Sequence, residues 1–270
     1  MNYGFDRLIV SSDHSCFLQF APIVSKAWRS LFPGLKLTLA YVSDDITPVS
    51  KLKILFDDVV IFNNIDGVSS ANLAKIARRY ACCLYDNEVC MIEDIDTAPL
   101  RSDYVINYAK QRKIGTLGLI GLEVYKGGKD YGKVPASNSF AESYIWKKII
   151  NPKNLGFEEW VISLKGIKIF DNIEDPHSNA YAFSDESLMR ALIKINNISE
   201  DLITHINRNC DPRKDWIDRS WWSIDSDKLR KNEYLLVNFK RPIGNEADIV
   251  VSHIYNLQSS IPTSKDGDEK

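Results

Sequence analysis

Short apolar runs alternate with amphipathic stretches along the first half of this chain, and this alternation is the feature that most constrains its fold. Apolar runs of a few residues bounded by polar residues are typical of buried strands, whereas apolar residues spaced three and four apart predict helices. Strands and helices that take turns predict an α/β fold, in which helices flank a mainly parallel central sheet. The strands are expected at residues 7–12, 35–42, 58–62, 89–92 and 116–120.

The stretches between these runs predict the helices, and the pattern becomes less regular after about Ile150. Ser69 and Ser70 are residues of the type that caps a helix, and an apolar face follows them from Leu73 to Leu84. Further helices are expected at residues 17–31, 102–110, 140–150, 184–195 and 199–207, and two late strands at residues 234–239 and 248–253.

The balance of charges excludes one broad class of function. The chain has 34 basic and 36 acidic residues and a formal net charge of -2, so it has no excess of cations to neutralise a nucleic-acid backbone. No apolar run approaches the roughly 18 residues that a membrane-spanning helix needs. We therefore expect a soluble, intracellular (cytoplasmic) protein without a transmembrane segment or a nucleic-acid partner. The five cysteines show no repeated spacing and are expected to be reduced, partly buried thiols.

Two carboxylates follow the fourth apolar run directly. Asp94 and Asp96 flank Ile95, and in an extended backbone both acids would project to one side while Ile95 enters the core. Carboxylates held that close repel each other unless a cation intervenes, and such oxygen ligands suit Mg²⁺ or Mn²⁺. A solvated acidic turn is the alternative, and Asp225 and Asp227 form a second triplet of this kind. Only the first triplet ends a buried strand, where open α/β sheets place their binding residues.

These segments resemble the nucleotide-sugar glycosyltransferases of the GT-A fold. The resemblance lies in Arg7 to Asp13, Leu37 to Asp45, Asn72 to Tyr80 and Met91 to Asp96. It covers the first half of the chain and implies a GT-A-like (Rossmann-like), mainly parallel sheet with a less regular acceptor side. It also implies a nucleoside-diphosphate sugar as donor, a glycan or other hydroxyl compound as acceptor, and Mn²⁺ or Mg²⁺ as cofactor.

The resemblance assigns donor-binding roles to residues at strand ends and on the helix before the Asp-x-Asp triplet. Asp13 is the stronger donor-binding candidate, although a strand-end aspartate also suits a helix cap, whereas Lys75 and Arg79 would equally form a solvated helix face. The metal ligands would be Asp94, Asp96 and, late in the chain, His253, although a lone histidine at a strand end is more often structural. The expected donor-binding residues are Ser11, Ser12, Asp13, Asp44, Asp45, Asn72, Lys75, Arg79, Asp94 and Asp96.

The acceptor side is expected in the second half. Ser137 and Asn138 lie in a small-residue turn that resembles the family's segment beside the donor sugar. Residues 211–222 combine acids with indoles, and indole faces stack on sugars while a neighbouring carboxylate accepts a proton. A core plug with a charged rim is the equal alternative. The expected catalytic bases are Asp215 or Asp218, and the expected sugar contacts are Trp221 and Trp222.

Together these features predict a metal-dependent glycosyltransferase that moves a sugar from a nucleoside-diphosphate sugar to an acceptor hydroxyl. The alternatives are a nucleotidyltransferase, although no glycine-rich basic loop follows the first strand, and a non-catalytic sugar-binding module. We expect residues 1–120 to form the nucleotide-sugar half and residues 121–258 the acceptor half of one domain. Residues 127–133 are expected to be a flexible loop, and residues 259–270 a disordered tail.

Overall fold

The fold is described from a computed structural model of the chain. The described residues are 3–13, 16–121, 134–135, 137–164 and 184–257. The expected loop at residues 127–133 and the expected tail at residues 259–270 lie outside these ranges.

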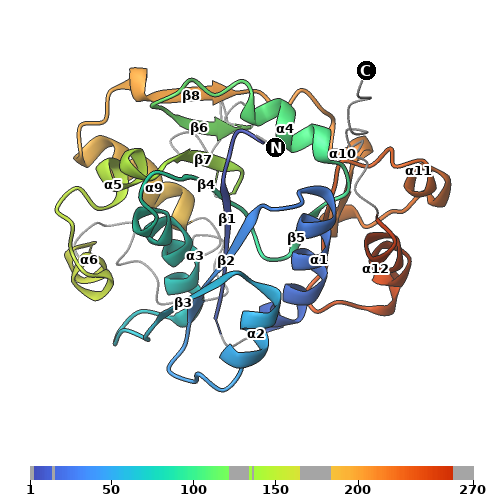
Figure 1. The fold of residues 1–270 in the computed structure, drawn as a ribbon, viewed down its shortest axis with the longest axis horizontal. Helices are drawn as coiled ribbons and strands as arrows, with labels where there is room; N and C mark the ends of the chain where they lie inside the picture. The colour runs from blue at the N-terminus through green and yellow to red at the C-terminus, as the bar shows by residue number, and fades with distance from the viewer. Residues whose placement is uncertain (1–2, 14–15, 122–133, 136, 165–183, 258–270) are drawn as a thin grey trace, which may run out of the picture.

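A mixed, mainly parallel sheet forms the centre of the molecule (Figure 1). The first four strands in spatial order, β3, β2, β1 and β4, are parallel, and β7 runs antiparallel to its neighbours β4 and β6. The last strand, β8, is parallel to β6. The strands, in the order in which they lie side by side, are β3 (Asp58–Phe62), β2 (Lys36–Val42), β1 (Arg7–Asp13), β4 (Val89–Ile92), β7 (Ser139–Glu142), β6 (Leu117–Ile120) and β8 (Ile203–Ile206).

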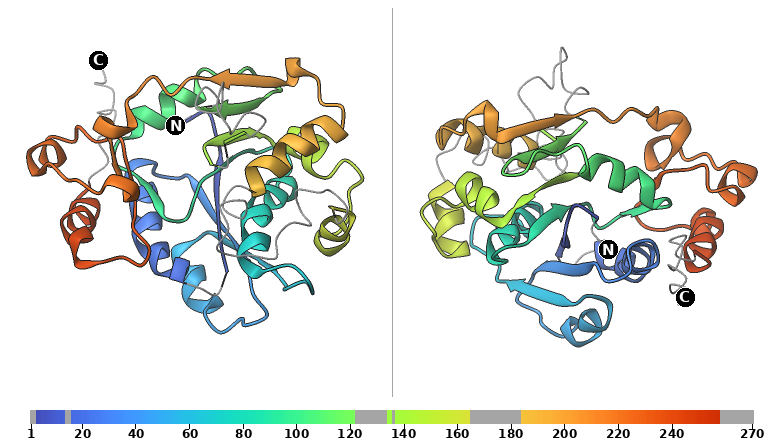
Figure 2. Two further views of the ribbon diagram at one scale, coloured as in Figure 1. Left: turned by 180° about the vertical axis from the view of Figure 1, so that it is seen from behind. Right: turned by 45° about the horizontal axis from the view of Figure 1, so that its top comes forward.

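Helices cover both faces of this sheet, as the alternation of strands and helices predicts (Figure 2). Side chains along β1 alternate between two cores: Leu8 and Val10 belong to the cluster that contains Trp28, whereas Ile9 belongs to the cluster that contains Ala77. The first cluster includes α1 (Ala21–Leu31) and α12 (Asp248–Tyr255). The second includes α3 (Ser70–Ala81), α5 (Ser143–Ile150), α6 (Phe157–Leu164) and α9 (Ser184–Ile195).

The start of α3 is fixed by the cap that the sequence predicts. The Ser69 side chain accepts a hydrogen bond from the Asn72 amide, which satisfies one of the free N–H groups of the first turn. The other α-helices of the described residues have between four and eight residues. They are α2 (Val49–Leu55), α4 (Ser102–Ala109), α10 (Pro212–Asp215) and α11 (Ser226–Arg230), with single 3₁₀ turns at Cys16–Phe20, Cys82–Leu84, Glu200–Leu202, Arg219–Trp221 and Asn245–Ala247.

A second, three-stranded sheet lies beside α1. Its strands are, in spatial order, β5 (Thr97–Pro99), β10 (Leu236–Asn238) and β9 (Trp216–Asp218). β10 is antiparallel to β5 and parallel to β9. Because only four residues separate the end of β4 from the start of β5, the small sheet begins close to the point where β4 leaves the large sheet.

Two expected helices are partly or wholly strands. Residues 139–142 form β7, inserted between β4 and β6, and the helix begins only at Ser143. A short buried strand has no periodicity that separates it from the apolar face of the helix that follows. At residues 199–207, Ser199 caps a single 3₁₀ turn, and the chain then pairs with β6 as β8. Pairing with the sheet therefore ends the helix after one turn.

The expected strand at residues 248–253 is a helix, α12. Val250 and Ile254 are buried four residues apart, while Ile249 is largely exposed, which is the spacing of a helix and not of a strand. Packing against α1 therefore overrides the β-propensity of this β-branched run.

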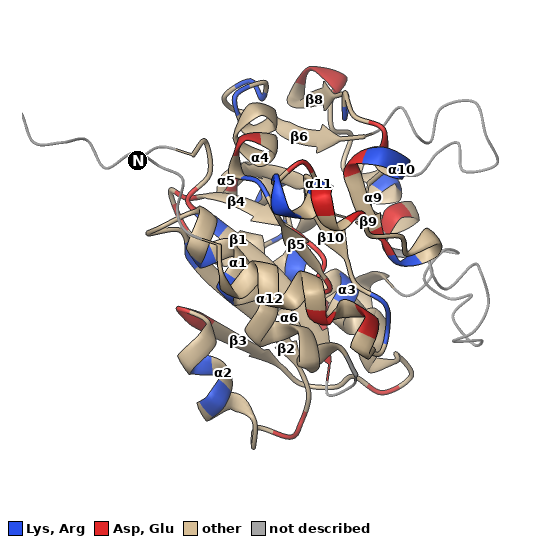
Figure 3. Cartoon of the chain, turned by 90° about the vertical axis from the view of Figure 1, so that its right-hand side faces the viewer, with Lys and Arg blue, Asp and Glu red and all other residues tan. Residues whose placement is uncertain are grey.

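The distribution of charge and of thiols agrees with the composition. Figure 3 shows basic and acidic segments interspersed over the elements in view. Cys82, Cys83 and Cys90 are buried and free, and burial raises the pKa of the Cys82 and Cys83 thiols. Among the described helices, none combines the length and the apolar character that crossing a bilayer requires.

Candidate functional site

The carboxyl end of β1 and the amino end of α3 meet at one end of the large sheet. Asp13, the last residue of β1, is buried and accepts a hydrogen bond from Ser70 Oγ at 2.9 Å. Ser11 and Ser12, which precede it, are buried as well. Since Ile9 pairs with Ile92 at the end of β4, Asp13 lies four residues, or about 13 Å, farther along the strand direction.

The acids after β2 hold the turn that follows it. Asp44 accepts hydrogen bonds from the side chain and the backbone of Asn64, and these lower the pKa of its carboxyl group. Asp45 accepts a hydrogen bond from the Thr47 amide at 2.8 Å. Both expected donor residues are therefore at the predicted edge of the sheet, with their carboxylates engaged in local contacts.

Arg78 is the residue of α3 that contacts the Asp-x-Asp triplet. Its side chain is only 4% exposed, and Nη1 donates to the Glu93 carbonyl oxygen at 3.1 Å and forms an ion pair with Asp94. Of the residues expected to face the donor, Asn72 and Arg79 are buried, and Arg79 Nη1 donates to the Lys75 carbonyl oxygen. The sequence placed three basic residues on this helix but gave no signal that separates Arg78 from Arg79.

The backbone of the triplet is a turn and not the extended segment that the sequence analysis assumed. The Thr97 amide donates to the Asp94 carbonyl oxygen at 3.1 Å, which closes a turn over Ile95 and Asp96. Ile95 is buried, as expected. Because of the turn, the two carboxylates have different partners: Asp94 meets α3, and Asp96 meets the small sheet.

Asp96 is fully buried and is held by two arginines. Its Oδ2 accepts from Arg219 Nη1 at 2.5 Å and from Arg241 Nε. Its Oδ1 is also buried and has no hydrogen-bond partner among the described residues. Arg219 Nη1 also donates to Asn238 Oδ1 at 3.1 Å, and the Arg241 guanidinium lies 4.5 Å from the centre of the Phe17 ring.

The register of the small sheet explains why these distant segments meet. Thr97, Asn238 and Asp218 occupy equivalent positions on β5, β10 and β9. Asp96 precedes the first of these residues, whereas Arg219 follows the last. The Phe239 amide donates to the Asp96 carbonyl oxygen at 2.8 Å, which fixes the strand end that leads to Arg241.

The cluster contains a third acid, Glu93. Burial and the charge of Asp94 raise the pKa of its carboxyl group to about 8. Burial alone would also raise the pKa of Asp94, but the charges of Arg78, Arg241 and Arg219 lower it overall. All three arginines therefore act on the same carboxylate, so the two halves of the triplet belong to one charged site.

Ser137 and Asn138 lie at this end of the large sheet. The Asn138 amide donates to the Ile92 carbonyl oxygen at 2.9 Å, and the Ser137 hydroxyl interacts with the Glu93 carboxyl group. Asn138 adopts a positive φ of 57°, a conformation that asparagine tolerates better than most residues. These two residues are thus next to the acids, where the sequence analysis places the donor sugar.

The two candidate bases lie at opposite ends of β9. Asp218 accepts from Asn238 Nδ2 at 3.2 Å and from the Ser220 amide at 2.8 Å, so it is connected to the Asp96 site. Asp215 precedes β9 and accepts from the Asp211 amide at 2.8 Å. Three strand residues, about 10 Å, separate the two ends. The structure brings Asp218 to the charged site and leaves Asp215 away from it.

The two tryptophans differ in burial. Trp221 is 43% exposed. Trp222 is partly buried against Phe239, with ring centres 6.3 Å apart, and Lys240 Nζ lies 5.8 Å from its ring. Trp221 is therefore the more exposed indole, whereas Trp222 packs against Phe239 and Lys240.

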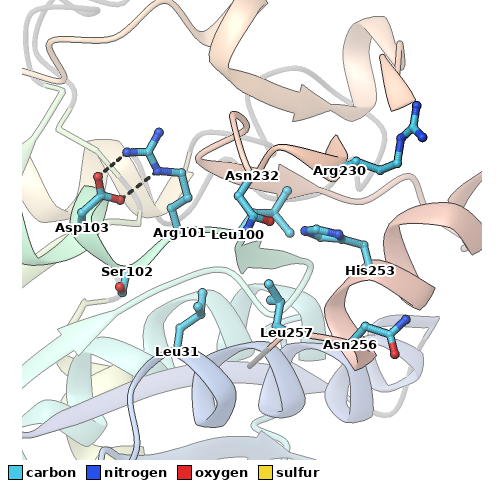
Figure 4. A pocket seen from close by; sticks show the side chains of 10 residues that line it. All are labelled: Leu31, Leu100, Arg101, Ser102, Asp103, Arg230, Asn232, His253, Asn256 and Leu257. Carbon is cyan, nitrogen blue, oxygen red and sulfur yellow. Dashed lines mark hydrogen bonds and ion pairs between the residues drawn. The ribbon is translucent and has the colours of Figure 1, made fainter. Parts of the chain in front are cut away.

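His253 is not brought to the aspartates. It lies on α12 and lines a pocket of about 520 Å³ with residues from α1, α4 and α11 (Figure 4). Its ring points toward Asn232 and Leu100, and burial lowers its pKa. The described residues contain no group of three or more His, Cys, Asp and Glu side chains that could hold a metal ion. The expected third ligand is misplaced because the strand that would have carried it is a helix.

The fold can be compared with solved structures. No protein-family profile matches the sequence, and no curated protein matches it either. An active-site mutant of LgtC is similar over 95% of this chain and 98% of that chain, with a TM-score of 0.51 and 9% identity. The chain has the GT-A fold.

Two other solved structures are similar at lower scores. The glycosyltransferase GlyE of Streptococcus pneumoniae TIGR4 is similar over 89% of this chain and 55% of GlyE, with a TM-score of 0.48 and 11% identity. The galactosyltransferase LgtC in complex with donor and acceptor sugar analogues gives a TM-score of 0.47 at 10% identity. At 9% identity, the likeness to the LgtC mutant shows the fold alone, and it confirms the predicted mainly parallel sheet flanked by helices.

GT-A proteins typically use a divalent cation. The residues present here fit one in a specific respect: Asp96 Oδ1 is a buried carboxylate oxygen that accepts no hydrogen bond from the described residues, and Asp94, two residues earlier in the chain, is partly exposed. Oxygen ligands of this kind are those that Mg²⁺ and Mn²⁺ prefer. Protein ligands beyond these two carboxylates are not supplied by the described chain, so substrate oxygens or waters would complete the coordination.

Proposed function

We propose that this protein is a glycosyltransferase that moves a sugar from a nucleoside-diphosphate sugar to a hydroxyl group of a glycan or another acceptor. The observation that carries the proposal is the cluster of Asp94 and Asp96 with Arg78, Arg219 and Arg241 at the carboxyl end of β4. Carboxylates to hold a cation and guanidinium groups to hold phosphate oxygens are the parts that a diphosphate leaving group needs.

The dimensions of the sheet edge support this choice of donor. Asp13 and the Asp94 region are separated by about 13 Å along β1, and Ser70 and Arg78 by about 12 Å along α3. A nucleoside can therefore lie between Asp13 and the strand ends, with its diphosphate reaching the arginines. Ser11, Ser12, Asp44 and Asp45 would contact the base and ribose, and Asn72, Lys75 and Arg79 would face the donor from α3.

Each residue of the charged site has a separate task in the proposed reaction. Asp94 and Asp96 would hold the divalent cation, Mn²⁺ or Mg²⁺, which offsets the charge that develops on the departing nucleoside diphosphate. Arg78 keeps Asp94 ionised and fixed. Arg219 and Arg241 would hydrogen-bond the phosphate oxygens as the bond between the sugar and the diphosphate breaks.

The acceptor is proposed to approach from the second half of the chain. Ser137 and Asn138 would bind hydroxyl groups of the donor sugar, while Trp221 offers its exposed face to the acceptor. Asp218 is the better placed of the two candidate bases to orient or deprotonate the acceptor hydroxyl, because it is hydrogen-bonded to Asn238 within the charged site. Residues 1–120 would thus supply most donor contacts and residues 121–258 the acceptor contacts.

A screen of nucleotide sugars tests this proposal. The protein is incubated with each donor and Mn²⁺, and release of nucleoside diphosphate is measured with and without EDTA. We expect one class of donor to be hydrolysed or transferred only with the cation, and the Asp96→Asn variant to lose that activity. Release of pyrophosphate from a nucleoside triphosphate and a sugar phosphate, supplied in a parallel incubation, with no release of nucleoside diphosphate from any nucleotide sugar, would indicate a nucleotidyltransferase. Glycan binding without any turnover would indicate a sugar-binding module.

A further inference from the structure

The two arginines that hold Asp96 also bear on when a cation can bind. We propose that Arg219 and Arg241 close the cation site in the donor-free protein, so that the cation enters together with a diphosphate and not before it. This inference rests on the proposed function, because it concerns the same cation and the same diphosphate.

The contacts of Asp96 are the first argument. Oδ2, one of its two oxygens, already accepts from both guanidinium groups. The other oxygen, Oδ1, is buried, so a cation reaching it must share the carboxylate with two fixed positive charges. Two like charges within a few ångströms of an incoming dication oppose its binding strongly in a site that excludes water.

The charge of the whole cluster is the second argument. Arg78, Arg219 and Arg241 contribute three positive charges, and Asp94 and Asp96 contribute two negative charges. Even with Glu93 ionised, the cluster has no net negative charge to attract a lone dication. A diphosphate adds negative charges, and the cation then enters a site whose balance favours it.

The exposure of the arginines is the third argument. The side chains of Arg219 and Arg241 are 34% and 36% exposed, whereas the Asp96 side chain is 1% exposed. Each arginine also has an anchor that does not involve Asp96, Asn238 for Arg219 and the Phe17 ring for Arg241. The guanidinium groups can therefore exchange Asp96 for phosphate oxygens while their anchors keep them at the site.

The experiment compares binding of Mn²⁺ alone with binding of Mn²⁺ and inorganic pyrophosphate. Electron paramagnetic resonance of the free Mn²⁺ signal measures the first, and calorimetric titration with the preformed Mn²⁺–pyrophosphate complex measures the second. The variants are Arg219→Gln, Arg241→Gln and the double variant. Arg230→Gln is the matched control, because Arg230 is an exposed arginine paired with Asp227 on α11.

We expect the arginine substitutions to change the affinities for the two ligands in opposite directions. The wild-type protein and Arg230→Gln should bind Mn²⁺–pyrophosphate at least about tenfold more tightly than Mn²⁺ alone. The double variant should bind Mn²⁺ alone at least about tenfold more tightly than wild type does. It should bind Mn²⁺–pyrophosphate more weakly than wild type does. Adding Asp96→Asn to the double variant should abolish the gain for Mn²⁺.

Two results would overturn the inference. One is a folded double variant, judged by its near-ultraviolet circular dichroism, that binds Mn²⁺ no more tightly than Arg230→Gln. The other is wild-type protein that binds Mn²⁺ alone as tightly as Mn²⁺–pyrophosphate. If the double variant fails to fold, the single variants decide the question by the same criterion. None of these measurements uses sugar transfer. A failed donor screen would therefore contradict the proposed function, whereas the binding measurements alone decide whether the two arginines oppose binding of the cation.

Discussion

The large and the small sheet build the two sides of the candidate site in different ways. The large sheet places Asp13 and Asp94 with elements that follow one another closely, and the partner of Asp94, Arg78, lies 16 residues away in the chain. The small sheet joins three distant segments, so the partners of Asp96 lie 123 and 145 residues away. Regular α/β alternation thus supplies one half of the site, and long-range strand pairing supplies the other.

This difference separates a contact that only holds the site in place from contacts that would take part in the proposed reaction. Asp94 has one buried partner, Arg78, that fixes it, whereas Asp96 has two partners, Arg219 and Arg241, that are about one-third exposed and can rearrange. If this distinction is right, substitutions at the end of the small sheet should affect turnover most, and substitutions elsewhere on either sheet progressively less.

The largest expected effect is at Asp96. Replacing it with asparagine removes the negative charge that attracts both arginines and the cation, and we expect kcat/KM for the donor identified in the screen to fall by about 1000-fold. Asp227→Asn is the control, because it alters the second Asp-x-Asp triplet on the exposed side of α11 and should change kcat/KM less than about twofold. Steady-state kinetics measure both, and comparable losses in the two variants would contradict the assignment.

The next effect separates the two ends of β9. Asp218→Asn should lower kcat by about 10- to 100-fold, because this carboxylate joins the charged site through Asn238. Asp215→Asn, at the other end of the strand, should leave kcat within about threefold of wild type and serves as the control. A larger loss for Asp215→Asn would place the acceptor at the opposite end of the small sheet.

A smaller effect is expected at the exposed indole. Trp221→Ala should raise KM for the acceptor by about fivefold and leave donor hydrolysis unchanged, since stacking on a sugar contributes about 1 kcal/mol. Initial rates at varied acceptor concentration test this expectation. An unchanged acceptor KM would show that Trp221 does not contact the acceptor.

The smallest effect lies at the amino end of β4, at the opposite end of the large sheet from the candidate site, and concerns stability. Burial alone would raise the pKa of Glu88, but hydrogen bonds from Arg7 at 2.6 Å and Lys36 at 2.5 Å lower it overall. A carboxyl group whose pKa is lowered by folding stabilises the protein above its unfolded-state pKa, and this contribution is lost as the pH falls through its folded-state pKa. We expect Glu88→Gln to reduce the free energy of unfolding by about 1 kcal/mol near neutral pH, and the difference should shrink toward acid pH as the pH falls through the lowered pKa of the Glu88 carboxyl group.

Urea unfolding of both proteins across this pH range measures that difference. Catalytic rates at neutral pH should be the same for Glu88→Gln and wild type, because Glu88 precedes β4 at the end away from Asp94. A gap in stability that widens in acid would contradict the expected sign.

The sequence predicted the large sheet well because each of its strands is bounded by polar residues and followed by a periodic helix. β3 and β4 have the predicted bounds, and Ser69 caps α3 as predicted. The errors are at β7, β8 and α12, whose structure depends on the neighbour against which each segment lies. Propensity within a short window cannot report such a neighbour.

The candidate site likewise divides into residues that a local pattern predicts and residues that only long-range contacts bring together. Asp13 and Asp94 lie where strand ends predict them, Ser137 lies in the expected small-residue turn, and the roles of all three remain proposals. Arg219, Arg241 and Asn238 were not recognised, because no local pattern marks an arginine that meets an acid more than 100 residues earlier. The only available signal was the position of Arg219 inside the acidic, tryptophan-rich segment that was expected to serve the acceptor.

The separation between Asp96 and Arg241 has a consequence for the order in which the molecule assembles. Closing a long loop is slower than forming local contacts, so the pair of Arg78 and Asp94 can form while β10 is still unpaired. Until β10 docks, Asp96 lacks both of its positively charged partners, Arg219 and Arg241. Without them, burying its carboxylate would be unfavourable. Pulse-labelling hydrogen exchange would then find the amides of β1 protected before those of β10. On this order of events, the small sheet is the last part to close, and the two carboxylates become one site only at the final step of folding.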